Sequence, residues 1–304
     1  MDFIGSKLKL HDWILNTIGD SVGASKDIVF LDACSGSGII SQQAAQRGYK
    51  VIASDLMMFP SVIVNGSIGL TDRQLATAEK HIDKLNALKG RKGYFYKNFS
   101  GTPGVKDDRL YFTEANAMRI DAVREAIDNV RDAKVRDYLL YCGLEAVSRV
   151  SNTTGVQAAY LKEFKERARQ EFLLRKEQSY AGTATGYCED VLHLLNRKHS
   201  REDILYIDPP YNHRQYGPNY HLYETFVRND NPTPIGMTGL RDWQSECKSE
   251  FCSSKSCLSF LRKLIEATTA RVVAISYNSD GLLTQDEIIS LGKHVFVFEQ
   301  EQRR

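Results

Sequence analysis

The stretch DILYIDPPYNHRQY occupies residues 203–216 and joins an apolar run to a polar turn. Ile204–Ile207 is apolar without alternation, as expected for a parallel strand that is covered on both faces. Asp208 follows at the carboxyl end, which is the edge of an open α/β sheet where ligands bind. The two prolines after it have no N–H to donate, so they end the strand and stiffen the loop. Taken alone, a strand-ending turn with an exposed Tyr211 explains the stretch equally well.

The composition is that of an ordinary globular protein. The chain has 304 residues, of which 42% are apolar and 26% charged, and this argues against a disordered class. It has no apolar run of the roughly 20 residues that cross a bilayer and no basic leader, so we expect a cytoplasmic protein with no membrane partner. Its six cysteines are then expected to be reduced, and the five-residue spacing of Cys247, Cys252 and Cys257 is not that of a zinc site. No metal is implied.

The net charge of +2 is too small to indicate a nucleic-acid partner by itself, but the charge is unevenly distributed. Residues 84–106 contain six basic side chains, no acidic one, and four interleaved aromatic rings. This mixture can contact phosphates and stack on bases, and Lys89, Arg91 and Lys92 are its central cations. A solvated loop with aromatic side chains packed on the core would have the same composition.

A second apolar run, residues 27–32, precedes a turn that contains Gly36 and Gly38, and helix-forming residues follow. A strand, a glycine turn and a helix in this order bring backbone close to a ligand at the helix amino terminus. The next strand, residues 50–54, is followed by Asp55. In Rossmann-like sheets an acidic residue at this place accepts hydrogen bonds from ribose hydroxyls. These features predict a pocket for a nucleotide-like cofactor.

The alternation of strands and helices stops between residues 71 and 185, where charged stretches have helical spacing, notably 121–150 and 157–176. Strand patterns resume at residues 186–190, 204–208, 271–276 and 294–298, with a crossover helix over 259–268. We therefore predict an α/β fold of at least six mostly parallel strands with helices on both faces. Its catalytic domain comprises residues 1–70 and 186–304, and 71–185 is a largely helical insertion. An ordinary solvated helical subdomain is the alternative for the insertion.

The order of the motifs resembles the Dam-like, alpha-group S-adenosylmethionine-dependent DNA adenine-N6 methyltransferases, over most of the chain. Four blocks carry the resemblance: DFIGSKLKLHDWI (residues 2–14), FLDACSGSG (30–38), SDL (54–56) and DPPY (208–211). Cys34 departs from the family, in which an aromatic residue is usual at this position. The resemblance implies a Rossmann-like methyltransferase fold, with the insertion as the target-recognition region.

The resemblance also implies roles for single residues. The implied cofactor-binding residues are Phe3, Gly5, Lys7, Asp32, Gly36, Gly38, Asp55 and Asp190, with S-adenosylmethionine as cofactor and S-adenosylhomocysteine as product. The implied catalytic residues are Asp208, Pro209, Pro210 and Tyr211. Candidates for nucleic-acid contacts are Lys89, Arg91, Lys92, Arg214 and Tyr216, although an ion pair with Glu224 would explain Arg214 nearly as well. The polar, glycine-containing stretch at 236–252 is placed to cover the site.

The DPPY block suits methyl transfer to an exocyclic amino group. That nitrogen is a poor nucleophile because its lone pair is delocalised into the ring. Acceptors at the Asp208 carboxylate and the Pro209 carbonyl would localise the pair and stabilise the positive charge that develops on nitrogen. The base must leave the duplex to be reached, and Tyr211 would stack on it.

The leading hypothesis is a site-specific methyltransferase acting on N6 of adenine in double-stranded DNA, as in restriction-modification systems, where a cognate restriction endonuclease acts separately. One alternative is another methyl acceptor, either RNA adenine or, with Asn in place of Asp, a protein amide. A second is a non-catalytic DNA-binding subunit, which the intact DPPY block and glycine turn oppose. A dehydrogenase would leave the DPPY block unexplained.

Overall fold

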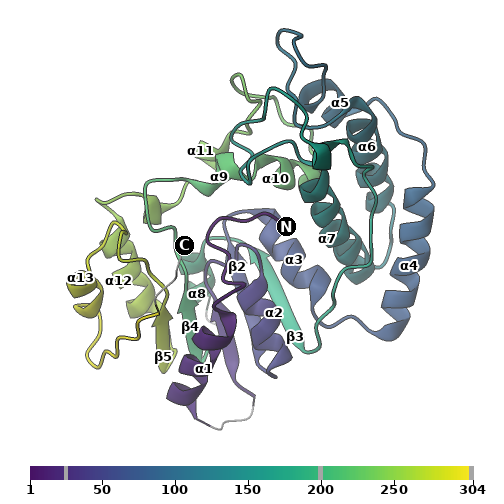
Figure 1. Ribbon diagram of the computed structural model, residues 1–304. Helices are drawn as coiled ribbons and strands as arrows, with labels where there is room; N and C mark the ends of the chain where they lie inside the picture. The colour runs from purple at the N-terminus through teal and green to yellow at the C-terminus, as the bar shows by residue number, and fades with distance from the viewer. Residues whose placement is uncertain (24–26, 198–200, 301–304) are drawn as a thin grey trace.

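A parallel β-sheet forms the centre of the computed structural model, which describes residues 1–23, 27–197 and 201–300 (Figure 1). Its strands are β1 (Val29–Asp32), β2 (Lys50–Asp55), β3 (Thr183–Cys188), β4 (Ile204–Ile207) and β5 (Val272–Ile275). They lie in the order β3-β2-β1-β4-β5 and every neighbouring pair is parallel. This arrangement confirms the predicted Rossmann-like α/β fold.

Helices cover both faces of the sheet. One face carries α1 (His11–Val22) and α2 (Ile39–Gln46), and the other carries α8 (Val191–Asn196), α12 (Cys257–Ala267) and α13 (Gln285–Ile289). Phe30 and Tyr206 pack into the first of these layers, whereas Leu31 and Leu205 pack into the second. Because both faces are buried, the strands read as apolar runs without alternation.

The strand order reverses between β1 and β4. These two strands pair in register, Phe30 with Ile204 and Asp32 with Tyr206. The chain proceeds from β1 to β2 and β3 on one side, and from β4 to β5 on the other. The loops after β1 and β4 therefore leave the sheet side by side, at the position where open α/β sheets bind their ligands.

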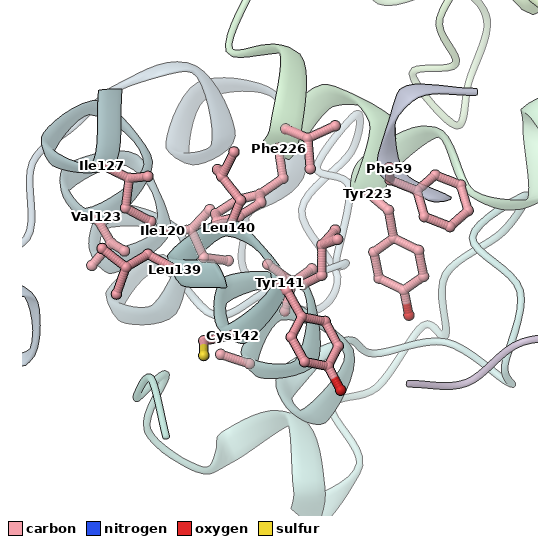
Figure 2. Close-up of a cluster of buried hydrophobic side chains, with 14 of the residues drawn as sticks. Phe59, Ile120, Val123, Ile127, Leu139, Leu140, Tyr141, Cys142, Tyr223 and Phe226 are labelled. Carbon is pink, nitrogen blue, oxygen red and sulfur yellow. The ribbon is translucent and has the colours of Figure 1, made fainter. Parts of the chain in front are cut away.

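A helical layer packs beside the sheet on α3 (Met58–Ser67) (Figure 1). It contains α4 (Asp72–Asn86), α5 (Tyr94–Phe99), α6 (Glu114–Asp128), α7 (Ala133–Val150) and α10 (His221–Arg228); shorter helices are α9 (Tyr216–Asn219), α11 (Trp243–Glu246), η1 (Glu166–Arg169) and η2 (Glu250–Cys252). Figure 2 shows how Ile120 and Val123 of α6 and Leu140 of α7 cluster with Phe226 of α10. The same core includes Phe59 of α3, so the insertion and the sheet domain are packed into each other.

Two predicted helical stretches differ from the structure. Residues 121–150 form two helices, α6 and α7, and the second begins at the cap Asp132. Residues 157–176 are mostly irregular, apart from the short η1, so the prediction of helix there was wrong. The side chains of Asn86, Asn116 and Asn152 bind backbone groups of this segment, for example both the N–H and the C=O of Leu174. These asparagines supply the hydrogen bonds that a helix would have made internally.

The predicted strand at residues 294–298 is also absent. Phe296 is 80% exposed and Phe298 is 55% exposed, so neither ring packs on a sheet face. Strand preference reflects packing on a pleated, half-buried surface, and an apolar run without that surface does not become a strand. The strand predicted at 186–190 does form, but it begins earlier, at Thr183. Within the described residues no helix is long and apolar enough to cross a membrane.

Candidate active site

A pocket lies at the carboxyl ends of β1, β2 and β4, and it encloses about 1040 Å³, part of it open to solvent. It brings together all four sequence blocks, which are far apart in the chain. The predicted residues that line it are Phe3, Gly5, Lys7, Asp32, Gly36, Asp55, Asp190, Asp208, Pro210 and Tyr211. Gly38 and Pro209 lie beside it without lining it. Cys247 and Ser249 also line it, so the stretch at 236–252 does reach the site.

The turn after β1 needs its glycines. Gly36 has a φ of +46°, and a Cβ there would lie 2.9 Å from the ring of Phe3. Gly38 has a φ of +75° and caps α2, and a Cβ there would lie 2.8 Å from Ile63. The Gly36 N–H donates to Asp55 Oδ2 at 3.0 Å. The end of β2 thus holds the turn in place, and backbone is open to the pocket where a side chain would fill it.

Two buried carboxylates border this turn. Ser41 donates to Asp32 Oδ2 at 2.7 Å, and burial raises the pKa of Asp32 to about 7. Burial also raises the pKa of Asp55 to about 6. Asp32 Oδ1 and Ser35 Oγ are buried without a hydrogen-bond partner among the described residues, and both residues line the pocket. Buried polar atoms are nearly always paired, so this wall of the pocket suits a polar ligand.

Asp208 forms a compact network with the other end of the chain. Lys7 Nζ lies 2.6 Å from Asp208 Oδ2 and 3.0 Å from the Gly5 carbonyl, and it also donates to the Tyr211 hydroxyl. The Tyr211 hydroxyl donates to Asp208 Oδ1 at 2.8 Å. Burial raises the pKa of Asp208, and the Lys7 cation opposes that shift. Both carboxylate oxygens are therefore accessible to donors within the pocket.

An aromatic wall closes the same pocket. The Phe3 ring stacks on Tyr220 with centroids 4.5 Å apart and meets the edge of Tyr216 at 5.7 Å. The Tyr220 hydroxyl accepts from the Ile4 N–H at 2.6 Å, which fixes the amino-terminal segment. Tyr216, a candidate for nucleic-acid contact, lies in this pocket beside Phe3. On the opposite side Asp190 caps α8, accepting from the Leu192 N–H at 2.8 Å.

Arg214 does not pair with Glu224, so that alternative was wrong. The Glu224 carboxylate accepts from the N–H groups of Met58 and Phe59 at 2.9 and 3.1 Å and pairs with Arg228 at 2.5 Å. It thereby caps the start of α3, a role for which the sequence carries no local signal. The Arg214 side chain is exposed and makes no ion pair within residues 1–23, 27–197 and 201–300.

The three basic candidates of the insertion lie on the link between α4 and α5, away from the pocket lining. Arg91 forms an ion pair with Glu125. Lys92 lies over the Tyr96 ring, 4.9 Å from its centroid. Lys89 is exposed.

The sequence model of D12 class N6 adenine-specific DNA methyltransferases matches residues 3–279. The chain belongs to this family. The matched residues include every predicted catalytic and cofactor-binding position. The enzyme therefore transfers a methyl group to N6 of adenine in DNA, and methyltransferases of this kind use S-adenosylmethionine.

Named relatives agree with the family. The Type II methyltransferase M.NlaIII of Neisseria lactamica is 33% identical over 316 residues, which span 100% of this chain and 92% of the relative. M.CviAII of Paramecium bursaria Chlorella virus 1, also a Type II methyltransferase, is 35% identical and spans 95% of this chain and 86% of the relative. M.FokI of Planomicrobium okeanokoites is 35% identical over 96% of this chain, but the match spans only 47% of M.FokI.

Proposed function

We propose that this methyltransferase modifies adenine within a short defined sequence of double-stranded DNA and serves as the modification enzyme of a restriction-modification system. The observation that supports the site most strongly is the meeting of Asp208 with the glycine turn in one pocket at the β1–β4 switch point. The similarity to Type II methyltransferases supports the biological role. In that role a cognate restriction endonuclease is a separate partner.

The pocket residues fit the methyl donor. S-adenosylmethionine supplies an electrophilic methyl group on a sulfonium when it is bound. The Asp55 carboxylate at the end of β2 would accept hydrogen bonds from ribose hydroxyls, and Asp190 would border the adenine end. The unpartnered oxygens of Asp32 and Ser35 would meet polar groups of the ligand. Phe3, Gly5, Lys7, Gly36 and Gly38 would complete this site by packing and by leaving room for it.

Asp208 and the Pro209 carbonyl would accept the two hydrogens of the target amino group and stabilise the charge that develops on nitrogen. In the structure the acceptor positions of Asp208 face Lys7 and the Tyr211 hydroxyl. The incoming amino group would therefore replace the Tyr211 hydroxyl at Asp208. The Tyr211 ring would then be free to stack on the base, with Pro210 limiting the mobility of the loop.

Residues 71–185 would serve as the target-recognition region, inserted between the catalytic segments 1–70 and 186–304. Their shared core with α3 and α10 supports this role, because it would hold recognition side chains at a fixed distance from the pocket. Lys89, Arg91, Lys92 and Arg214 are proposed to contact DNA. Tyr216 we assign instead to the aromatic wall of the cofactor pocket, beside Phe3.

The test is to treat duplex DNA and, in parallel, RNA with the protein and methyl-labelled donor, digest both, and identify the labelled nucleoside. We expect N6-methyladenine from DNA, within one short sequence. Label in RNA alone would establish the RNA methyltransferase alternative. No label in either, from a folded protein that binds DNA, would establish a non-catalytic subunit.

A further inference from the structure

A second hollow borders the amino-terminal segment that forms part of the cofactor pocket. Its lining consists of Asp2, Phe3, Ile4, the loop 153–156, Lys165, Arg167 and Arg214. Phe3 and Ile4 line both spaces, so the two are neighbours. Arg214 lies three residues after Tyr211, on the loop that carries the proposed catalytic carboxylate. We call this space the basic hollow.

The basic hollow has an excess of positive charge. Three of its lining residues are cationic, and Asp2 is the single carboxylate among them. Arg167 pairs with Asp2, and Lys165 donates to the Thr153 carbonyl. Arg167 Nε is buried without an acceptor, and the Arg214 guanidinium makes no hydrogen bond in the described part of the chain. One cation pair is thus compensated, and two positive charges remain.

The loop of the hollow adds neutral donors. The backbone N–H groups of Thr154, Gly155 and Val156 make no hydrogen bond within the described residues. Gly155 has a φ of +102°, and a Cβ there would meet no atom within 4 Å, so the backbone is open on this side. Burial, and secondly the nearby Arg167, lower the pKa of Lys165, a cost that a bound anion would offset. Cations, amides and hydroxyls together are the usual partners of phosphate oxygens.

We propose that the basic hollow binds a backbone phosphate of the target strand next to the extruded adenine. This inference rests on the proposed function and adds where the strand is held. Phosphate contacts position a duplex without reading its sequence. A phosphate fixed beside Phe3 and Arg214 would hold the sugar of the extruded nucleotide near Asp208, so the hollow would support base capture at any recognised sequence.

The first test compares two double variants in DNA binding as a function of salt. Lys165→Gln with Arg214→Gln alters the hollow and leaves the Arg167–Asp2 pair intact. Lys80→Gln with Lys84→Gln removes the same charge from the exposed face of α4. We expect the hollow variant to bind any duplex at least about tenfold more weakly and to lose about 0.9 of salt slope per contact removed, whereas the α4 variant keeps the wild-type slope. Equal slopes in both variants would overturn the proposal.

The second test locates the phosphate. Single phosphates around the mapped adenine are replaced in turn by uncharged methylphosphonates. We expect one position to weaken wild-type binding and to have no further effect on the hollow variant. If every position weakens both proteins by the same factor, the hollow does not contact the strand. If inorganic phosphate competes with DNA through the hollow without any such position, the hollow binds free phosphate and the strand assignment is wrong.

The two levels of inference fail differently. Identification of N6-methyladenine made by the wild-type protein tests the proposed function and does not involve the hollow. Salt dependence with unmodified duplex tests the hollow and needs no turnover. A wild-type enzyme that methylates DNA and a hollow variant that behaves like the α4 variant would refute this inference alone.

Discussion

Asp208 illustrates how a buried carboxylate is kept usable. Burial in the pocket raises its pKa, which favours the protonated form. A protonated carboxyl would donate a hydrogen to the target amino group instead of accepting one. The Lys7 cation at 2.6 Å opposes this shift, so we infer that it keeps Asp208 ionised as well as orienting it.

Replacing Lys7 should therefore change the pH dependence of methyl transfer. In Lys7→Met the pKa of Asp208 rises further, so the fraction of ionised acceptor at a given pH falls. We expect the acidic limb of the single-turnover rate, plotted against pH, to move to higher pH, and Lys7→Arg to restore much of its position. Saturating donor in every assay separates this effect from weaker cofactor binding. An acidic limb that does not move in Lys7→Met would show that the cation does not control Asp208.

Asp55 makes a prediction about the cofactor alone. Asp55→Ala removes a charged acceptor for ribose hydroxyls and releases the Gly36 N–H. Hydrogen bonds to charged groups contribute roughly 1.5–3 kcal/mol, so affinity for S-adenosylmethionine should fall by about one to two decades. Calorimetry on a variant with native circular dichroism measures this, and unchanged affinity would remove Asp55 from the site.

At the scale of elements, α3 connects the pocket to the insertion. Its first turn is capped by Glu224 of α10. At its other end, a Cβ on Gly66 would lie 2.4 Å from the Asp137 carbonyl of α7. Backbone of two helices meets there without space for a methyl group, so the insertion is attached through contacts that tolerate little change.

Gly66→Ala should therefore destabilise the fold although alanine favours helix. Overpacking of this kind costs about 1–3 kcal/mol, and we expect a lower melting temperature. Gly19→Ala in α1 is the matched control, because its Cβ would meet only the Tyr49 hydroxyl, at 3.6 Å. That change should be neutral or stabilising by up to about 1 kcal/mol. Similar melting temperatures for the two variants would mean that α3 and α7 are less tightly packed than described.

Elements also mark the limit of prediction from sequence. The strands, the glycine turn and the DPPY loop are local patterns, and they were predicted correctly. The stretch at 157–176 has helical composition, yet its hydrogen bonds come from asparagines such as Asn86, which lies 88 residues from Leu174. The segment at 294–298 has strand composition but no face to cover. In both cases distant partners, present or absent, decided the structure.

At the scale of the whole molecule, the site joins the two ends of the chain. Lys7 and Asp208 are 201 residues apart in sequence and meet because the strand order reverses between β1 and β4. Sequence patterns predicted that Lys7 and Asp208 share a site, but not that they bind each other. They also placed Arg214 near the site without revealing the hollow, which is assembled from four separate segments.

The basic link between α4 and α5 can now be judged against this architecture. Arg91 already pairs with Glu125 and Lys92 lies over Tyr96, so Lys89 is the least engaged of the three cations. Neutralising all three should weaken binding to cognate and unrelated duplexes alike and reduce the salt slope by no more than about 0.9, the value for one phosphate contact. A loss of several units would show that the whole link lies on DNA, and an unchanged slope that it is an ordinary solvated loop.

The central claim is that the Asp208 carboxylate promotes methyl transfer to adenine. It is tested most directly by single-turnover transfer to the mapped DNA site, at saturating donor and DNA, in wild type and Asp208→Ala. Removing one preorganised electrostatic group costs on the order of a hundredfold or more in rate, so we expect transfer to fall at least that far while DNA binding persists. A correctly folded Asp208→Ala protein that methylates adenine at nearly the wild-type rate would contradict the account.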